Sequence, residues 1–250
     1  MKTLFFTSNT KHYLKLGDKR VPKALDDTNG IVLQLKALLP KDGTFLFVAS
    51  TPSLREKVDS YSSLLFEGLK LSGLTFAKYL ILDDRTKDLA KDFVREADVI
   101  FLSGGDTYIE NEFFKEIHLA TLLEDYSGVI IGQSAGSINM AGHVYNSPEE
   151  GDHSEPIYFD GLGLSNINIE PHFELDSSSF DELQMYQRRH LLEESFKRPV
   201  YGLCDGAHII EVDGRATIYG ETYLIQDGNI IKLCSNKEKY ELPIENEFIL

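Results

Sequence analysis

Short apolar runs alternate with longer amphipathic segments through the first 140 residues of the chain. The runs are rich in β-branched and aromatic residues, which favours strands, and they occupy residues 4–7, 44–49, 76–82, 99–102 and 129–132. Helical periodicity fills the intervals between them, at about 28–39, 54–71, 86–96 and 107–123. Near-continuous apolar strands separated by helices are typical of a mostly parallel sheet covered on both faces. We therefore predict a doubly wound α/β structure, with ligand sites at the carboxyl ends of the strands.

The pattern changes after about Gly142. An irregular, acidic stretch runs from His143 to Gly163 and is either a lid over a site or a solvated excursion. A strand at 167–170 and a helix at about 180–196 follow. The remainder predicts a C-terminal set of short strands, with Asp-Gly hairpin turns, at 200–203, 208–212, 215–219, 222–225 and 229–233. Because no segment reads as a linker, we expect one domain over residues 1–250.

Composition and charge narrow the classes of function. The chain has 250 residues and a net charge of −15, which disfavours binding to nucleic acid or to an anionic membrane. Two cysteines are too few for a disulfide framework, and no His/Cys/Asp cluster has zinc-site spacing. The start of the chain lacks a signal-peptide pattern, and no apolar stretch is long enough to span a membrane. We expect a cytoplasmic protein without metal or organic cofactor; its oligomeric state is open, with a homodimer as one arrangement.

A candidate nucleophile lies in residues 132–136, whose sequence Gly-Gln-Ser-Ala-Gly fits the pattern G-x-S-x-G around Ser134. An apolar strand enters this segment and a helix-compatible stretch leaves it. A nucleophile elbow needs that arrangement, because its serine occupies a strained turn in which flanking glycines avoid collisions. Ser134 is therefore the predicted nucleophile of a serine hydrolase. The alternative is an ordinary turn in which Ser134 caps the helix.

A second glycine turn, Ser103-Gly104-Gly105-Asp106, ends the preceding strand. Neighbouring parallel strands bring their carboxyl ends together, so this loop can face Ser134. A glycine pair lets a peptide N–H approach a substrate closely, which makes Gly105 a candidate oxyanion donor beside the N–H of Ala135. We expect Asp106 to cap the following helix and to contribute to substrate binding.

A serine nucleophile needs a base, and seven histidines are available. His172 differs from the others because it follows a predicted strand, in Glu170-Pro171-His172-Phe173, and strand-end loops carry the chemistry of parallel-sheet enzymes. The orienting carboxylate has two candidate sources. One is Asp205, in a glycine turn after an apolar strand, and the other is the acidic segment 149–155. The order Ser134, His172, Asp205 differs from the order Ser, Asp/Glu, His of α/β-hydrolases.

With these residues assembled, the sequence resembles the peptidase E (aspartyl dipeptidase) family of serine peptidases, whose relatives include the cyanophycinases. The resemblance rests on four motifs in order, namely Gly104-Gly105-Asp106-Thr107, Gly132-Gln133-Ser134-Ala135-Gly136, Pro171-His172-Phe173 and Gly202-Leu203-Cys204-Asp205-Gly206. It implies a class I glutamine-amidotransferase-like α/β fold. It also implies Ser134 as nucleophile, His172 as base, and the N–H groups of Gly105 and Ala135 as oxyanion donors.

Four positions depart from the family pattern, the first being Asp106, where the family usually has Asn. Asp205 falls where the family typically has Glu, and the acid that precedes a Pro-Ile pair in some members is replaced by Ser154 before Glu155-Pro156-Ile157. The aspartyl dipeptidases of the family bind the acidic side chain of the substrate through an Arg on the helix after the His. Met185 aligns with that Arg, and Arg188 lies one helical turn later. Arg188 is thus a candidate substrate-binding residue, with surface ion pairing to Glu193 or Glu194 as the alternative.

These observations predict a serine peptidase that hydrolyses small peptides, such as dipeptides including Asp-X, through an acyl-enzyme on Ser134. The alternatives are a related amide, isopeptide or ester hydrolase, and a non-catalytic ligand-binding member of the fold. Glutamine amidotransferase activity is disfavoured, because those enzymes have a Cys at the elbow and position 134 is Ser.

Overall fold

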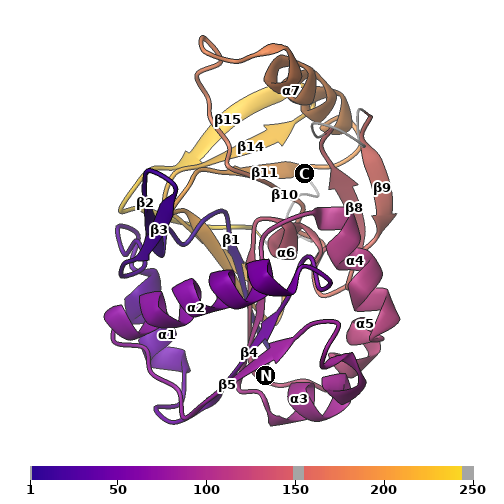
Figure 1. Cartoon of the computed structure of the whole chain (residues 1–250). Helices are drawn as coiled ribbons and strands as arrows, with labels where there is room; N and C mark the ends of the chain where they lie inside the picture. Colours follow the sequence, from indigo (N-terminus) through magenta and orange to yellow (C-terminus); the bar gives the residue numbers. More distant parts are fainter. Residues whose placement is uncertain (1, 149–154, 244–250) are drawn as a thin grey trace.

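A large mixed sheet forms the centre of the protein, as seen in the computed structural model, which describes residues 2–148 and 155–243 (Figure 1). Its strands are β1 (Thr3–Thr7), β4 (Thr44–Val48), β5 (Lys78–Leu82), β6 (Val99–Leu102), β7 (Val129–Gln133), β12 (His208–Val212), β13 (Arg215–Tyr219) and β16 (Lys239–Glu241). They are arranged in the order β16-β13-β12-β1-β7-β6-β4-β5. The segment from β1 to β5 is parallel, whereas β12, β13 and β16 add antiparallel strands at the other edge. The predicted α/β class and mostly parallel sheet are confirmed.

Helices cover both faces of this sheet. The first group is α1 (Ile31–Leu38) and α2 (Arg55–Leu71), and the second is α3 (Ala90–Glu96), α4 (Thr107–Glu116), α5 (Leu119–Leu122) and α6 (Ala135–Ile138), with a 3-10 turn η1 (Lys87–Leu89) before α3. Alternate strand residues serve the two layers: Phe47 and Phe101 pack in the cluster under α1 and α2, while Val48 and Leu102 pack in the opposite one. Both clusters are fully apolar, which explains the near-continuous hydrophobic strands in the sequence.

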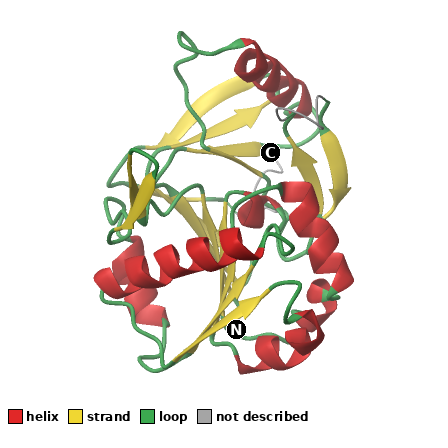
Figure 2. Ribbon diagram, viewed as in Figure 1, coloured by secondary structure: helices red, strands yellow, loops and turns green. Residues whose placement is uncertain are grey.

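A second sheet of four strands lies above the carboxyl ends of the parallel strands in the view of Figures 1 and 2. It contains β10 (Ile169–Pro171), β11 (Val200–Leu203), β14 (Thr222–Gln226) and β15 (Asn229–Cys234). Helix α7 (Glu182–Glu194) packs beside it. In this sheet β10 and β11 are parallel neighbours, so the residues that follow them leave at the same edge.

Three local predictions are wrong. The segment before α1 contains a hairpin, β2 (Tyr13–Leu16) and β3 (Lys19–Pro22), that we did not expect. The stretch predicted to be irregular contains the antiparallel pair β8 (His143–Asn146) and β9 (Ile157–Asp160). The predicted helix 107–123 is divided between α4 and α5, because His118 adopts a left-handed conformation (φ 55°) that interrupts helical geometry.

Within the described ranges, no helix is both long and apolar enough to cross a bilayer.

Candidate active site

Ser134 occupies a sharp turn between β7 and α6, with φ 51° and ψ −112°. This backbone conformation is unfavourable for a residue with a side chain, and neighbouring contacts hold it in place. The Ser134 N–H donates to the carbonyl of Thr7 at 2.9 Å. A Cβ at Gly132 would lie 2.6 Å from the Ser137 backbone, and one at Gly136 would lie 2.2 Å from the carbonyl oxygen of Leu102. Both glycines of the G-x-S-x-G pattern are therefore needed for the chain to pass through this turn.

The Gly104-Gly105 loop lies beside Ser134, as its position after the neighbouring strand β6 predicts. A Cβ added at Gly104 would be 3.5 Å from the Cβ of Ser134, and one at Gly105 would be 2.2 Å from Ser50 Oγ. Ser50, at the end of β4, fixes the loop by donating a hydrogen bond to the Gly104 carbonyl at 2.8 Å. Ala135, the first residue of α6, follows the serine directly. The backbone of Gly105 and that of Ala135 thus approach the serine from two adjacent strands.

The second sheet positions the predicted base and acid. His172 follows β10 and Asp205 follows β11, and the two are joined by a 2.7 Å contact between His172 Nδ1 and Asp205 Oδ1. The other ring nitrogen, Nε2, is 3.1 Å from Ser134 Oγ. With Nδ1 protonated, His172 donates to Asp205 and accepts from the Ser134 hydroxyl. Three residues chosen from separate strand ends in the sequence therefore form one line of hydrogen bonds.

Ser8 and Asn9 connect this line to the first strand. Ser8 Oγ donates to Asp205 Oδ1 at 2.8 Å and accepts from the His172 backbone N–H at 2.7 Å, while Asn9 Nδ2 donates to Asp205 Oδ2 at 3.2 Å. Partial burial alone would raise the pKa of Asp205, but the hydrogen bond and positive charge of His172, with those of Ser8 and Asn9, lower it to about 2. Neither residue belongs to a motif that we recognised in the sequence, although polar side chains directly after an apolar parallel strand are a usable signal.

The other candidate acids lie elsewhere or cannot be placed. Glu155 accepts a hydrogen bond from Tyr186 Oη at 2.9 Å, away from His172. Glu149, Glu150 and Asp152 lie outside the described residues. Among the acids that the structure places, Asp205 is the one that contacts His172.

One cavity opens on the α2 side of Ser134 and has a volume of about 340 Å³. Residues from several segments line it, including Asn9, Tyr13, Arg20, Phe47, Ser50, Lys57, Tyr61, Gly104, Gly105, Gln133, Ser134 and His172. Its floor is fixed by Gln133, whose amide donates to Tyr61 Oη at 2.5 Å and accepts from Thr10 Oγ1 at 2.8 Å. Burial raises the pKa of Tyr61, so its hydroxyl stays neutral. We call this the α2-side cavity.

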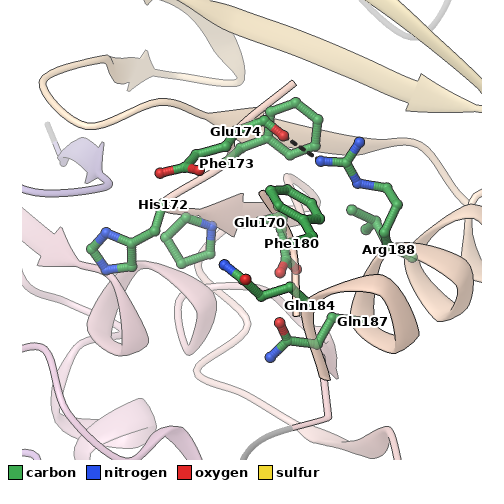
Figure 3. Close-up of a pocket in the computed structure, with 10 residues that line it drawn as sticks. Glu170, His172, Phe173, Glu174, Phe180, Gln184, Gln187 and Arg188 are labelled. Atoms are coloured by element: carbon green, nitrogen blue, oxygen red, sulfur yellow. Dashed lines mark hydrogen bonds between the residues drawn. The ribbon is translucent and has the colours of Figure 1, made fainter. Parts of the chain in front are cut away.

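A second cavity, of about 220 Å³, lies on the other side of His172 against α7, and we call it the α7-side cavity. Figure 3 shows His172 at one end of it and Arg188 at the other. The Arg188 guanidinium donates to the Glu174 carbonyl and stacks on two rings, 4.6 Å from the centre of Phe173 and 5.2 Å from that of Phe180. Its polar capacity is therefore partly used within the protein, and the expected ion pairs with Glu193 or Glu194 are absent from the described contacts.

The remaining predicted positions are outside both cavities. Asp106 caps α4 by accepting from the Ile109 N–H at 2.9 Å, and it does not line the cavity that holds Ser134. Met185 is half exposed and faces a separate surface depression with Tyr186 and Arg189. The described residues contain no group of three or more His, Cys, Asp or Glu side chains that could hold a metal ion.

Two solved structures are similar to this chain in fold. The chain aligns with a peptidase from an acI-B1 Actinobacterium (TM-score 0.65, 14% identity, 96% of each chain covered). It also aligns with a protein of Listeria monocytogenes EGD-e whose name relates it to peptidase E (TM-score 0.59, 19% identity, 86% of this chain and 96% of the other).

Sequence similarity extends to curated proteins. Peptidase E of Citrobacter koseri is 30% identical over 145 residues, a match that spans 54% of this chain and 62% of that protein's length. The "Probable alpha-aspartyl dipeptidase" of Drosophila melanogaster is 26% identical over 188 residues, which cover 71% of this chain and 73% of the other. Residues 25–219 match the family model of peptidase family S51, and this range includes the elbow, His172 and Asp205. Because the match covers well over half of the chain, the protein belongs to peptidase family S51, a family of serine peptidases.

Proposed function

We propose that this protein hydrolyses small peptides through an acyl-enzyme on Ser134. One observation carries the proposal: the hydrogen-bonded line from Ser134 Oγ through His172 to Asp205, at 3.1 and 2.7 Å. Side chains at these distances can pass a proton from the serine to the imidazole without rearrangement. The half-exposed ring of His172 leaves room for a substrate to reach the serine.

The first half of the reaction uses all three side chains. His172 Nε2 takes the proton of Ser134 Oγ as the oxygen attacks the scissile carbonyl carbon. Asp205 holds the ring so that Nδ1 carries its proton, and it stabilises the positive charge that the ring acquires. The low pKa of Asp205, about 2, keeps it charged in this role. His172 then gives the proton to the leaving amine, and an acyl-enzyme forms as the C–N bond breaks.

The oxyanion is held by the backbone N–H groups of Gly105 and Ala135 in this proposal. Neither of these N–H groups donates a hydrogen bond to a backbone carbonyl of the described residues. Each such donor contributes about 3–4 kcal/mol to stabilising the transition state in related sites. Water activated by His172 then attacks the acyl carbon and releases the second product, which restores Ser134.

Labelling with a fluorophosphonate probe tests the chemistry. We expect stoichiometric modification of Ser134, read by mass spectrometry of the labelled peptide, and hydrolysis of members of a dipeptide panel with acidic, neutral and basic N-terminal residues. Ser134→Ala should lower the rate of hydrolysis by about 10⁴-fold or more. His172→Ala should abolish labelling while leaving the serine in place.

Ser60→Ala serves as the matched control, because Ser60 is an exposed serine on α2 that lies outside both cavities. It should label and hydrolyse as the wild type does. No labelling of the wild type and no hydrolysis over a series of pH values would refute the proposal and would point to a non-catalytic member of the fold.

We also propose a cytoplasmic location. Both cysteines, Cys204 and Cys234, are free thiols, which is usual for a reducing compartment. Fractionation of cells that express the protein tests this directly.

A further inference from the structure

The α2-side cavity is lined by two cationic side chains, Arg20 and Lys57, and by no carboxylate. Arg20 comes from β3 of the N-terminal hairpin, which precedes the residues that match the family model, and Lys57 comes from the first turns of α2. Ser134 and His172 line the same cavity. Positive charge and the reacting atoms therefore share one cavity.

The hairpin is anchored closely against α2 through Gly68. A Cβ at Gly68 would lie 2.9 Å from both His12 Cβ and the carbonyl oxygen of Lys23, the residues that flank the hairpin. Only a glycine on α2 permits this approach. Arg20 is then placed over the Tyr13 ring, with its guanidinium carbon 5.1 Å from the ring centre. The position of Arg20 thus follows from backbone packing at the base of the hairpin.

Neither cation has an ion-pair partner among the described residues. By contrast, Arg55, two residues from Lys57 on α2, pairs with Asp84 at 2.9 Å. His12, next to Tyr13, adds no further positive charge, because burial, with a smaller contribution from Arg20, lowers its pKa to about 4 and keeps it neutral at neutral pH. Both side chains are exposed and line the cavity, so the positive charges of Arg20 and Lys57 favour a negatively charged ligand there.

We propose that Arg20 and Lys57 form a subsite for a carboxylate of the peptide substrate and thereby set its specificity. This inference rests on the proposed peptidase function. The Arg20 guanidinium can hold a carboxylate with two parallel hydrogen bonds, and Lys57 adds a second charge from the facing element. The carboxylate belongs either to an acidic side chain next to the scissile bond or to the C-terminus of a short peptide.

Arg188 is a poorer candidate for the same task. Its guanidinium already donates to the Glu174 carbonyl and stacks between Phe173 and Phe180, and the cavity that it lines also contains Glu170 and Glu174. A substrate carboxylate there would meet two further carboxylates, which oppose its binding. We therefore assign recognition of the substrate carboxylate to Arg20 and Lys57 rather than to Arg188.

Paired peptides test the proposal. Asp-Leu is compared with Asn-Leu, and Leu-Asp with Leu-Asn, each as free acid and as C-terminal amide, by kcat/KM. We expect the wild type to prefer the peptide that carries the recognised carboxylate by about 10- to 100-fold, the range for a charge-assisted hydrogen bond. The comparison of Asp with Asn peptides, and that of free acids with C-terminal amides, show which carboxylate the subsite binds. In Arg20→Gln/Lys57→Gln the preference should fall to about threefold or less, mainly through KM.

The control is Lys15→Gln/Lys19→Gln, which removes the same charge from the same hairpin at positions outside the cavity. It should keep the wild-type preference, and all variants should still label at Ser134. Calorimetric binding of the same peptides in a Ser134→Ala background gives a readout that needs no hydrolysis.

The outcomes separate the two proposals. Labelling and hydrolysis with equal preference in the wild type and in Arg20→Gln/Lys57→Gln would overturn the carboxylate subsite and leave the peptidase function intact. Loss of labelling in the wild type would overturn the peptidase function. Equal binding of acidic and neutral peptides in the Ser134→Ala background would overturn the subsite whether or not the wild type is active.

Discussion

Two cavities flank His172, and they differ in what their charged groups are free to do. The α2-side cavity has Arg20 and Lys57 without an acidic neighbour in its lining. The α7-side cavity has Arg188, but this side chain is stacked on aromatic rings and bonded to a backbone carbonyl, and two glutamates share the space. An arginine that helps to hold the protein together has less hydrogen-bonding capacity left for a ligand. The location of a cation in a pocket is thus a weaker guide to specificity than the partners that it already has.

Among changes that test this comparison, the largest effect should follow from Asp205→Asn, which acts on His172, the residue between the cavities. The substitution favours the wrong tautomer of His172, and we expect kcat to fall by about 10³- to 10⁴-fold. Since the loss concerns the chemical step, it should be the same for peptides with and without a carboxylate. A loss confined to acidic peptides would instead assign Asp205 to substrate recognition. It would contradict the separation between the hydrogen-bonded line of Ser134, His172 and Asp205, which performs the chemistry, and the cavities, which bind the substrate.

A smaller effect is expected from Arg188→Met on the α7 side. The substitution removes two cation–π contacts and one hydrogen bond, so we expect the free energy of unfolding in urea to fall by about 1–2 kcal/mol. The preference for acidic peptides should not change. Arg189→Met is the matched control, because Arg189 stacks on Tyr186 alone, at 4.8 Å, and should cost less. If Arg188→Met abolishes the acid preference, the roles of the two cavities are reversed.

The smallest effect concerns pH and the stability of the catalytic line itself. The pKa of Asp205 is lowered from 3.8 to about 2, so its carboxylate stabilises the folded state fully above about pH 4, and this contribution is lost as the pH falls through 2. The Tm difference between wild type and Asp205→Asn should be larger above about pH 4 than below it, and should shrink as the pH falls toward 2. Solvent screening of this half-exposed pair keeps the difference modest. An equal Tm difference at about pH 2.5 and pH 7 would contradict the hydrogen-bonded geometry of Asp205.

The layered fold could be predicted because its signals are local. Runs such as 99–102 are apolar throughout, since both faces of each parallel strand are buried, and the Asp-Gly turns at 213–214 and 227–228 mark the C-terminal hairpins. That Ser134, His172 and Asp205 lie together could be predicted for the same reason, because each follows an apolar strand in a glycine- or proline-containing turn; their catalytic roles stay a prediction. A substrate-binding role for Asp106 stays a prediction, because the structure shows its helix cap alone.

The hairpin β2–β3 could not be predicted because it buries little. Leu14, Leu16 and Val21 are exposed, so the hairpin does not have the buried apolar face by which a strand is recognised in a sequence. The pair β8–β9 was not predicted because an acidic stretch separates the two strands in the sequence, although they pair with each other in the structure. Arg20 and Ser134 line one cavity because segments more than a hundred positions apart pack together, for which a single sequence carries no signal.

Ser8 makes assembly of the site depend on parts of the chain that are distant in sequence. Its hydroxyl joins the end of β1 to His172 and Asp205, and that strand pairs on one side with β7 and on the other with β12. Residues 3–8 therefore have to come together with residues 205–212 before the site can close. We expect a chain truncated before β12 to lack hydrolytic activity, so that the peptidase is inactive until these distant segments have paired.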